Sequence, residues 1–273
     1  MIALLNKHKI GIALSGGGAK GVSHLGVLKA LEEIGLRIDL ISGVSAGAII
    51  GALYADGNTP EEICEHLSKG SLYRSVSLTK PKNGGLAKME MYKQHIAQLL
   101  KAKRIEDLKH PLIINATELN SGKNIYFEQG PLIDCVIASA SVPIFFAPTQ
   151  INNKLYVDGG IFCNLPASIL REKGCELVIG VHVNPITHID NVNGIVQLSE
   201  RIFHLAVNGN TIEQKKECDI VIEMEQLPEV GMFDSTKSWE IFDAGYNIAM
   251  ETFHNCDWEE LLTRIRIANS YKR

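Results

Sequence analysis

Short apolar runs alternate with segments of helical periodicity along most of the chain. The run at 9–14 stops at a glycine cluster, and apolar residues then recur every three or four positions over 22–34, before Gly35. This pattern predicts a strand, a loop and a helix, in that order. Similar patterns predict strands at 39–42, 111–117, 124–128, 154–157, 176–183 and 219–223, and helices at 46–55, from 60 onward after the cap Thr59, and at 88–101, 131–140, 166–173, 194–216 and 235–255.

The alternation predicts the fold class. Strands separated by helices tend to pair in parallel, and a parallel sheet is buried beneath helices on both faces. We therefore expect an α/β fold, a three-layer α/β/α arrangement with a mainly parallel central sheet. No repeat or linker divides residues 1–273, so we expect one domain, with its motifs in about 8–185 and its C-terminal helices in 190–273. The serine- and lysine-rich stretch 68–85 is either a lid or a surface connection.

Composition narrows the classes of partner. The 273 residues carry 27 Lys and Arg against 31 Asp and Glu, a net charge of −4, and the basic residues are scattered among acidic ones. A nucleic-acid partner is therefore not expected. The longest uncharged stretch, 135–153, contains two prolines, which argues against a membrane-spanning helix, and the N-terminus is too short in apolar residues for a signal peptide. The six cysteines form no CxxC pair, which favours a cytoplasmic protein with reduced thiols and no structural metal.

Three glycine-rich turns hold the candidate chemistry, and the first lies between a predicted strand and a predicted helix. Backbone N–H groups and the positive end of the helix dipole converge there, so this turn is suited to binding negative charge. Its residues also match the dinucleotide fingerprint G-x-G-x-x-G, although Asp39, the expected ribose-binding acid, precedes its strand instead of ending it. A dinucleotide-binding oxidoreductase is thus one alternative for this turn, which consists of Gly16, Gly17, Gly18, Ala19, Lys20 and Gly21.

The second turn, 43–47, has the pattern G-x-S-x-G between a predicted strand and a predicted helix. A serine on such a sharp elbow projects its hydroxyl beyond the sheet, while Gly43 and Gly47 remove side chains that would obstruct the turn. Ser45 is therefore the candidate nucleophile. The alternative is a serine that only caps a glycine-rich helix start.

The third turn, Asp158-Gly159-Gly160, places an acid at the end of a predicted strand. No histidine lies in a recognisable strand-end motif, so Asp158 is the candidate base. A carboxylate beside a serine in a dry site can accept its proton directly. The alternative is an ordinary Asp-Gly hairpin turn.

In order and spacing, the three turns resemble the patatin-like phospholipase family. Its signature is G-G-G-x-[K/R]-G, then G-x-S-x-G, then D-G-[A/G], and the similarity continues in 138–143, 146–148 and 164–166. The resemblance implies a Ser–Asp dyad without a catalytic histidine, in which Ser45 attacks an ester carbonyl and Asp158 takes and returns the proton. It further implies that turn 16–21 is the oxyanion hole, acting through the N–H groups of Gly16 to Gly18. Lys20 either orients this turn and adds positive potential or is simply solvated.

The resemblance also implies the substrate class, which is lipid acyl esters cleaved as by a phospholipase A, lysophospholipase or esterase. Contact with a membrane would then be transient and governed by the substrate, because no polybasic patch or lipid anchor is present. No cofactor is implied. A non-catalytic lipid-binding or regulatory relative is the other alternative, and the sequence predicts no oligomeric state. Four residues could line an acyl-chain pocket or pack in the core: Val142, Pro143, Phe145 and Phe146.

Overall fold

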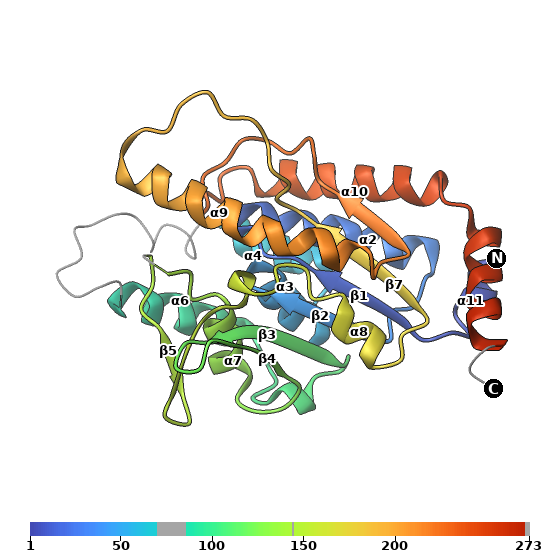
Figure 1. The fold of residues 1–273 in the computed structure, drawn as a ribbon, viewed down its shortest axis with the longest axis horizontal. Coiled ribbons are helices and arrows are strands. Elements are labelled where there is room, and N and C mark those ends of the chain that lie inside the picture. Colours follow the sequence, from blue (N-terminus) through green and yellow to red (C-terminus); the bar gives the residue numbers. More distant parts are fainter. Residues whose placement is uncertain (70–85, 144, 271–273) are drawn as a thin grey trace.

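A twisted sheet runs through the middle of the computed structural model, which describes residues 1–69, 86–143 and 145–270 (Figure 1). Apart from its first two residues, the loop expected at 68–85 lies outside the described residues. The strands are β1 Ile10–Leu14, β2 Leu40–Val44, β3 Leu112–Glu118, β4 Lys123–Phe127, β5 Thr149–Ile151, β6 Lys154–Asp158, β7 Leu177–His182 and β8 Ile220–Glu223. They follow the order β5-β6-β3-β2-β1-β7-β8, and β4 pairs with β3 beside this path.

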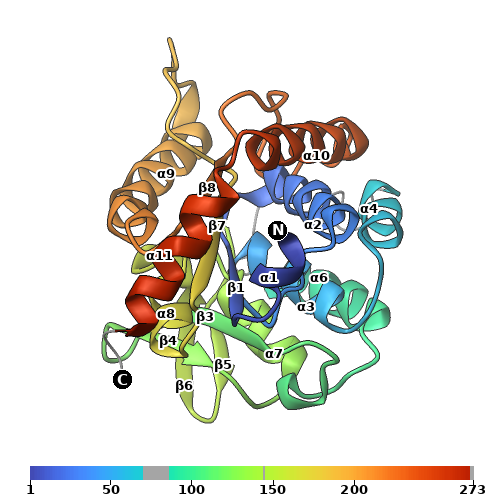
Figure 2. The same ribbon diagram turned by 90° about the vertical axis from the view of Figure 1, so that its right-hand side faces the viewer.

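Helices cover both faces of the sheet (Figure 2). They are α1 Ile2–Leu5, α2 Ser23–Ile34, α3 Ala46–Ala55, α4 Pro60–Ser68, α6 Leu86–Leu99, α7 Leu132–Ser139, α8 Ser168–Glu172, α9 Gly194–Lys215, α10 Ser238–His254 and α11 Trp258–Ser270, with short 3₁₀ turns η1 Gly18–Val22, η2 Ile105–Asp107 and η3 Gly159–Ile161. On one face α2, α3 and α10 lie together with α4 against them, and α8 and α9 lie on the other face. The predicted three-layer α/β fold is confirmed.

The sheet is parallel through its centre and antiparallel at one side. β3, β2, β1, β7 and β8 pair in parallel, whereas β4 and β6 run antiparallel to β3, and β5 runs antiparallel to β6. Short turns join β3 to β4 and β5 to β6, and a two-residue hairpin cannot connect parallel neighbours. Asn152 and Asn153 form the β5–β6 turn with φ of 49° and 62°, a left-handed conformation that asparagine tolerates.

The two faces of β1 bury different halves of the core. Ile10, Ile12 and Leu14 belong to the larger apolar cluster, which also contains residues of α2, α3 and α10. Ala13 belongs to a smaller cluster with Ile169 and other residues around α8. This alternation follows from the two-residue period of a strand. Because both faces are covered, the strand is apolar throughout and the chemistry collects where the strands end.

Helix ends and helix surfaces follow the sequence pattern closely. Thr59 and Glu62 form the predicted capping box at the start of α4, with Glu62 N–H donating to Thr59 Oγ1 and Thr59 N–H donating to Glu62 Oε2. In α3 every residue but Tyr54 is buried, as expected for a helix that is apolar on all sides. In the part of the chain that the structure describes, no helix has the length and apolar character needed to cross a membrane.

Candidate active site

The register of β3 brings Ser45 and Asp158 together. Asn115 pairs with Val44 of β2 on one side and with Tyr126 of β4 on the other. The next residue, Ala116, also pairs with β4 on one side. On its other side, the side on which Asn115 pairs with β2, Ala116 pairs with Asp158 of β6. The end of β2, which is followed by Ser45, therefore lies next to the end of β6 at Asp158, although the two residues are far apart in the sequence.

Ser45 has the strained backbone of a nucleophile elbow. Its φ of 54° and ψ of −120° lie outside the regions that non-glycine residues normally adopt, and its side chain is buried. The Ser45 N–H donates to Ser139 Oγ at 2.8 Å, and the Ser139 hydroxyl donates to the Asn115 carbonyl at 2.6 Å. A Cβ on Gly47 would lie 2.2 Å from the Leu14 carbonyl oxygen, so only glycine allows α3 to start this close to β1. These contacts hold the elbow in its strained conformation.

Asp158 is buried at the end of β6, and one of its two carboxylate oxygens accepts a hydrogen bond while the other has no hydrogen-bond partner among the described residues. The Gly160 N–H donates to Oδ1 at 2.8 Å, whereas Oδ2 is buried and makes no hydrogen bond of normal geometry with the described residues. Burial raises the pKa of Asp158 to about 6, outweighing the Ser45 hydroxyl and the Gly160 N–H, which both act to lower it. A carboxylate with this pKa is mostly ionised at neutral pH yet basic enough to accept a proton.

The glycine turn lies beside Ser45, and only some of its N–H groups lack an acceptor among the described residues. A Cβ on Gly16 would lie 3.2 Å from Ser45 Cβ. The Gly16 N–H donates to the Asn164 carbonyl at 3.3 Å and the Ala19 N–H donates to the Met232 carbonyl at 2.8 Å. The N–H groups of Gly17 and Gly18 meet no acceptor among the described residues. Two of the three predicted donors therefore remain available.

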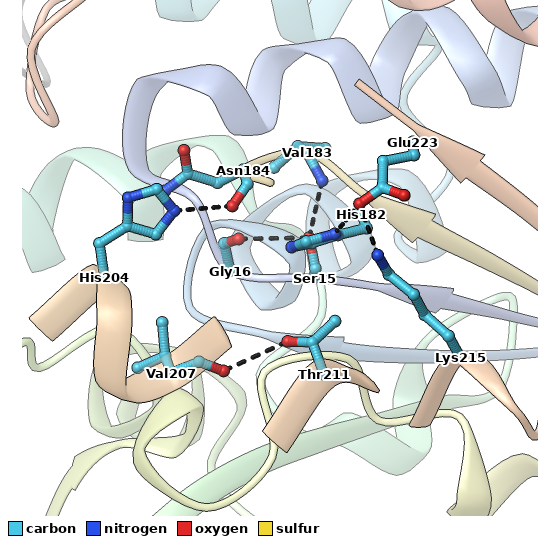
Figure 3. A network of polar contacts seen from close by, with 10 residues as sticks. All are labelled: Ser15, Gly16, His182, Val183, Asn184, His204, Val207, Thr211, Lys215 and Glu223. Carbon is cyan, nitrogen blue, oxygen red and sulfur yellow. Dashed lines mark hydrogen bonds and ion pairs between the residues drawn. The ribbon is translucent and has the colours of Figure 1, made fainter. Parts of the chain in front are cut away.

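Ser15 orients the peptide that carries one of these donors (Figure 3). Its hydroxyl accepts the Val183 N–H at 3.0 Å and donates to the Gly16 carbonyl at 3.2 Å. Because a trans peptide places C=O and N–H on opposite sides, fixing the Gly16 carbonyl also directs the Gly17 N–H away from Ser15. Gly18 has φ of 58°, and a Cβ there would lie 2.5 Å from the Met232 carbonyl oxygen, so this position requires glycine.

Lys20 ties the glycine turn to the loop after β7. Its Nζ donates to Asn184 Oδ1 at 3.1 Å, and burial lowers its pKa, with Glu229 acting in the opposite sense. The Lys20 side chain is half-buried. The remaining residue of the turn, Gly21, packs against Ala46, where a Cβ would lie 2.5 Å from Ala46 Cβ.

A cavity of about 560 Å³ adjoins Ser45 and Asp158. Ser45 and Asp158 contribute to its lining together with the glycine turn, and its apolar wall includes Ile49, Val142, Phe146, Phe203 and Phe233. Of the four predicted pocket residues, Val142 and Phe146 line this cavity and Pro143 and Phe145 do not. Phe145 instead packs edge-on against Phe233, with ring centroids 5.6 Å apart.

Several residues of the site are not individually predicted by the sequence. Ser139 and Asn164 fall in segments that carried the family resemblance, and that similarity was the available signal. The wall formed by α9 and residues 229–234 comes from the C-terminal third, where no motif pointed to it. The two acid-turn glycines have a packing role, because a Cβ on Gly159 would lie 2.5 Å from the Asn115 carbonyl oxygen and one on Gly160 would lie 2.9 Å from Asn164 Oδ1.

The histidines near the site are engaged elsewhere. His204 lines the cavity, but its Nε2 lies 2.7 Å from the Asn184 carbonyl oxygen, with which it pairs. His24 is fully buried behind the glycine turn with Nε2 2.9 Å from the Ser15 carbonyl, and burial lowers its pKa to about 4. His182 pairs with Glu223 through Nδ1 at 2.9 Å (Figure 3). None of these contacts places an imidazole on Ser45.

The geometry gives little support to a dinucleotide site or a metal site among the described residues. The Asp39 carboxylate accepts the Ile10 N–H at 2.9 Å and pairs with Arg37 at 2.9 Å, at the start of β1 and β2. The glycine turn follows the other end of β1, so Asp39 is not placed as a ribose-binding acid would be. Within 1–69, 86–143 and 145–270 no three His, Cys, Asp or Glu side chains cluster as metal ligands would.

The fold and the site define a class of protein before any relative is considered: a three-layer α/β protein with a serine elbow and an acid turn at the ends of its strands. Residues 12–171 match the family model of patatin-like phospholipases. Since that match covers more than half of the chain, the protein belongs to the patatin-like phospholipase family, whose chemistry is the hydrolysis of ester bonds.

Two relatives illustrate the range of similarity in sequence. An uncharacterized NTE family protein of Mycobacterium tuberculosis is 33% identical over 179 residues, which cover 64% of this chain and 49% of that protein. The lysophospholipase NTE1 of Kluyveromyces lactis is 29% identical over 274 residues, covering 89% of this chain and 19% of the yeast protein. The chain thus spans about half the length of its mycobacterial relative and about a fifth of the yeast one.

Solved structures share the fold at lower identity. VipD from Legionella pneumophila superimposes with a TM-score of 0.51 and 15% identity, covering 91% of this chain and 67% of that one. Human GIVD cytosolic phospholipase A2 superimposes with a TM-score of 0.51 and 13% identity, covering 96% of this chain and 60% of that one. The architecture is therefore common to proteins whose sequences differ widely.

Proposed function

We propose that this protein is a serine acyl hydrolase in which Ser45 and Asp158 form a catalytic dyad. The observation that carries the proposal is their meeting in one cavity, with Ser45 on a strained elbow and Asp158 buried with an open Oδ2. The glycine turn beside them offers two N–H groups without acceptors among the described residues. A nucleophile, a base and oxyanion donors are the parts that acyl transfer needs.

The reaction follows from these positions. Ser45 Oγ attacks the ester carbonyl while its proton passes to Asp158, and the resulting oxyanion accepts hydrogen bonds from the Gly17 and Gly18 N–H groups. Collapse of this intermediate breaks the ester bond, and Asp158 returns the proton to the departing alkoxide. Water then attacks the acyl-enzyme while Asp158 takes its proton, and as the acyl–serine bond breaks and the acid is released, Asp158 returns this proton to Ser45 Oγ. Each oxyanion donor in such a site typically contributes about 3–4 kcal/mol to transition-state stabilisation.

Lipid acyl esters are the proposed substrates, cleaved in the manner of a phospholipase A or lysophospholipase. The cavity is lined by Val142, Phe146 and further aromatic residues, which suits an acyl chain. The yeast relative is named a lysophospholipase, which favours the same substrate class. Lys20, held against Asn184, positions the glycine turn in this proposal and adds positive potential near it. The cytoplasmic location of the protein stays a prediction from the sequence.

A fluorophosphonate probe tests the dyad, because it reacts with activated serines. We expect the adduct to map to Ser45, labelling to be lost in Ser45→Ala, and the rate to fall at least about a hundredfold in Asp158→Asn. Asp190→Asn, on a fully exposed carboxylate, is the matched control and should label normally. Labelling that depends on His204 instead, judged by His204→Gln, would contradict the dyad.

A substrate panel separates the remaining alternatives. Lysophosphatidylcholine, phosphatidylcholine and p-nitrophenyl butyrate are offered to the wild type and to Ser45→Ala. Cleavage of the lipids by the wild type alone is the expected result. Cleavage of the short ester alone would refute the lipid substrate and leave the dyad intact. Lipid binding with neither labelling nor turnover would indicate a non-catalytic relative, and tight binding of a nicotinamide dinucleotide would favour the oxidoreductase.

A further inference from the structure

From Ile195 to Ile212 the outward side of α9 is apolar, the reverse of an ordinary surface helix, and exposed charge returns to this side only in the last turn, at Glu213 and Lys216. Its large exposed apolar residues repeat at intervals of three, four and seven, which keeps them within an arc of about 100° on one helix face. They are between 43% and 74% exposed. We call these residues the outer row: Ile195, Leu198, Ile202, Leu205 and Ile212.

Polar contacts on the opposite side of α9 hold this orientation (Figure 3). His204 pairs with the Asn184 carbonyl, and Lys215 forms an ion pair with Glu223 of β8. Further along the helix, Asn210 accepts the Asn164 N–H at 2.7 Å and donates to the Gly160 carbonyl at 2.8 Å. Rolling α9 to bury the outer row would break these bonds. The outer row therefore faces outward because the helix is anchored through its other side.

The apolar surface continues from the outer row to the mouth of the cavity. Ile189 and Val192, in the loop between β7 and α9, line the cavity and are also 40% and 39% exposed. This loop and the first turns of α9 lie at the same end of the molecule (Figure 1). A surface that covers the outer row would thus lie against the rim of the proposed active site.

Charge is absent from the outer row. Between 194 and 212 the charged residues are Glu200 and Arg201, which line the cavity, and the exposed ion pair of Glu213 and Lys216 follows beyond the row. A helix with one apolar side and an anchored polar side can lie in the plane of a lipid interface with its apolar residues among the acyl chains. A second copy of the chain on the same face would instead overlie the rim and obstruct the entry of substrate.

We propose that the outer row, together with Ile189 and Val192, docks the protein on the surface of a zwitterionic lipid aggregate. The cavity then opens directly onto the lipid that supplies the substrate. The purpose of this docking, to supply lipid substrate, rests on the proposed function. The contact with lipid can nevertheless form in a protein that does not hydrolyse it. Because the interaction is apolar, it should persist at high salt, unlike attachment through basic residues.

Binding of the Ser45→Ala protein to phosphatidylcholine vesicles, measured by co-sedimentation at low and high salt, tests the proposal. The double substitution Ile195→Ser/Ile202→Ser should weaken binding at least about tenfold, because two apolar side chains lose their lipid contact. The matched control is Leu119→Ser/Ile267→Ser, since these residues are 50% and 52% exposed on the β3–β4 turn and on α11. Vesicle binding by the control should be unchanged.

Three further measurements decide between outcomes. Circular dichroism and p-nitrophenyl butyrate hydrolysis, in the background with Ser45 intact, show whether Ile195→Ser/Ile202→Ser is folded with its site in order. Vesicle binding that is equal in both double variants would overturn the proposal. A dimer that dissociates in Ile195→Ser/Ile202→Ser while vesicle binding stays unchanged would assign the row to self-association. Vesicle binding through the row by a protein that cleaves no ester would uphold docking and refute the proposed hydrolase.

Discussion

Asp158 shows how one residue answers two opposed demands in the proposed dyad. As a base it must be ionised, yet the site that excludes water from Ser45 also penalises its charge. The structure resolves this with one backbone hydrogen bond, from Gly160, and leaves the other oxygen open. The result is a pKa raised to about 6, far enough from its ordinary value of 3.8 to govern activity near neutral pH.

The rate of ester hydrolysis should therefore depend on pH through Asp158. Since the ionised form is the base, kcat/KM for a short ester should rise about tenfold per pH unit below about 6 and level off above it. The profile is measured by following p-nitrophenyl butyrate hydrolysis from about pH 4.5 to about pH 8, in steps of about half a pH unit. A rate that stays level down to about pH 4.5, as a pKa at the ordinary value of 3.8 would give, or a bell-shaped profile centred on a histidine, would contradict the role given to Asp158.

Sequence motifs identify Ser45 and Asp158 as candidates, but they do not show which N–H groups of the glycine turn lack an acceptor. The fate of each N–H in the glycine turn depends on residues from other elements, since Asn164 engages Gly16 and Met232 engages Ala19. Neither partner is near the turn in sequence. A motif lists the backbone groups that could serve and leaves their hydrogen-bond partners undetermined.

Between elements, the contact of α2 with α10 depends on two glycines. A Cβ on Gly26 would lie 2.2 Å from the Phe242 carbonyl oxygen, and one on Gly245 would lie 2.3 Å from the Ser23 carbonyl oxygen. Both obstacles are backbone atoms, which cannot swing aside. The two helices therefore pack with their backbones in close approach, and this contact holds the C-terminal third on the sheet.

Gly245→Ala should lower the free energy of unfolding by about 1–3 kcal/mol, because the added methyl group forces the helices apart. Gly209→Ala is the matched control: it lies inside α9, and a Cβ there meets nothing within 4 Å. That variant should gain about 0.5–1 kcal/mol from helix propensity. Urea unfolding followed by circular dichroism measures both. Equal effects of the two substitutions would show that the close approach is unimportant.

Element prediction succeeded where the periodicity was long or the run strongly apolar. It did not include β5, which has three residues, or α1, which has four, because such short pieces carry almost no pattern. It also did not include α11, in which Leu261, Leu262 and Ile265 are buried among charged residues that dilute the pattern. The antiparallel direction of β4 and β6 relative to β3 was likewise not indicated by hydrophobicity, because an apolar run carries no direction.

On the scale of the whole molecule, we propose that residues 1–273 form one cooperative unit, as the sequence predicts. The larger apolar cluster contains residues from Leu5 to Ile265, far beyond the segment 12–171 that matches the family model. It includes Ile241 and Phe242 of α10 with Leu25 and Leu28 of α2. The C-terminal third thus completes the core as well as the wall of the cavity.

Unfolding should accordingly show a single transition. Both tryptophans, Trp239 and Trp258, lie in the C-terminal third, so their fluorescence reports that part while far-ultraviolet circular dichroism reports the whole chain. The two signals should change together in urea, as expected of a two-state protein. Loss of the fluorescence signal at clearly lower urea would mean that the C-terminal third unfolds on its own. A chain ended at residue 190 provides a second check, since without α9, β8 and α10 it should not fold.

The sequence by itself determined the features that are local. Apolar periodicity sets helices and strands because each depends on neighbours a few positions away, and the three turn motifs place a candidate nucleophile, a candidate base and a run of glycine N–H groups at strand ends. Only the tertiary structure decided which of these meet. Ser45 reaches Asp158 because β2 and β6 use the same edge of β3 in succession, and the outer row faces outward because α9 is anchored through its polar side. Both outcomes arise from strand register and helix packing, which join residues distant in the chain.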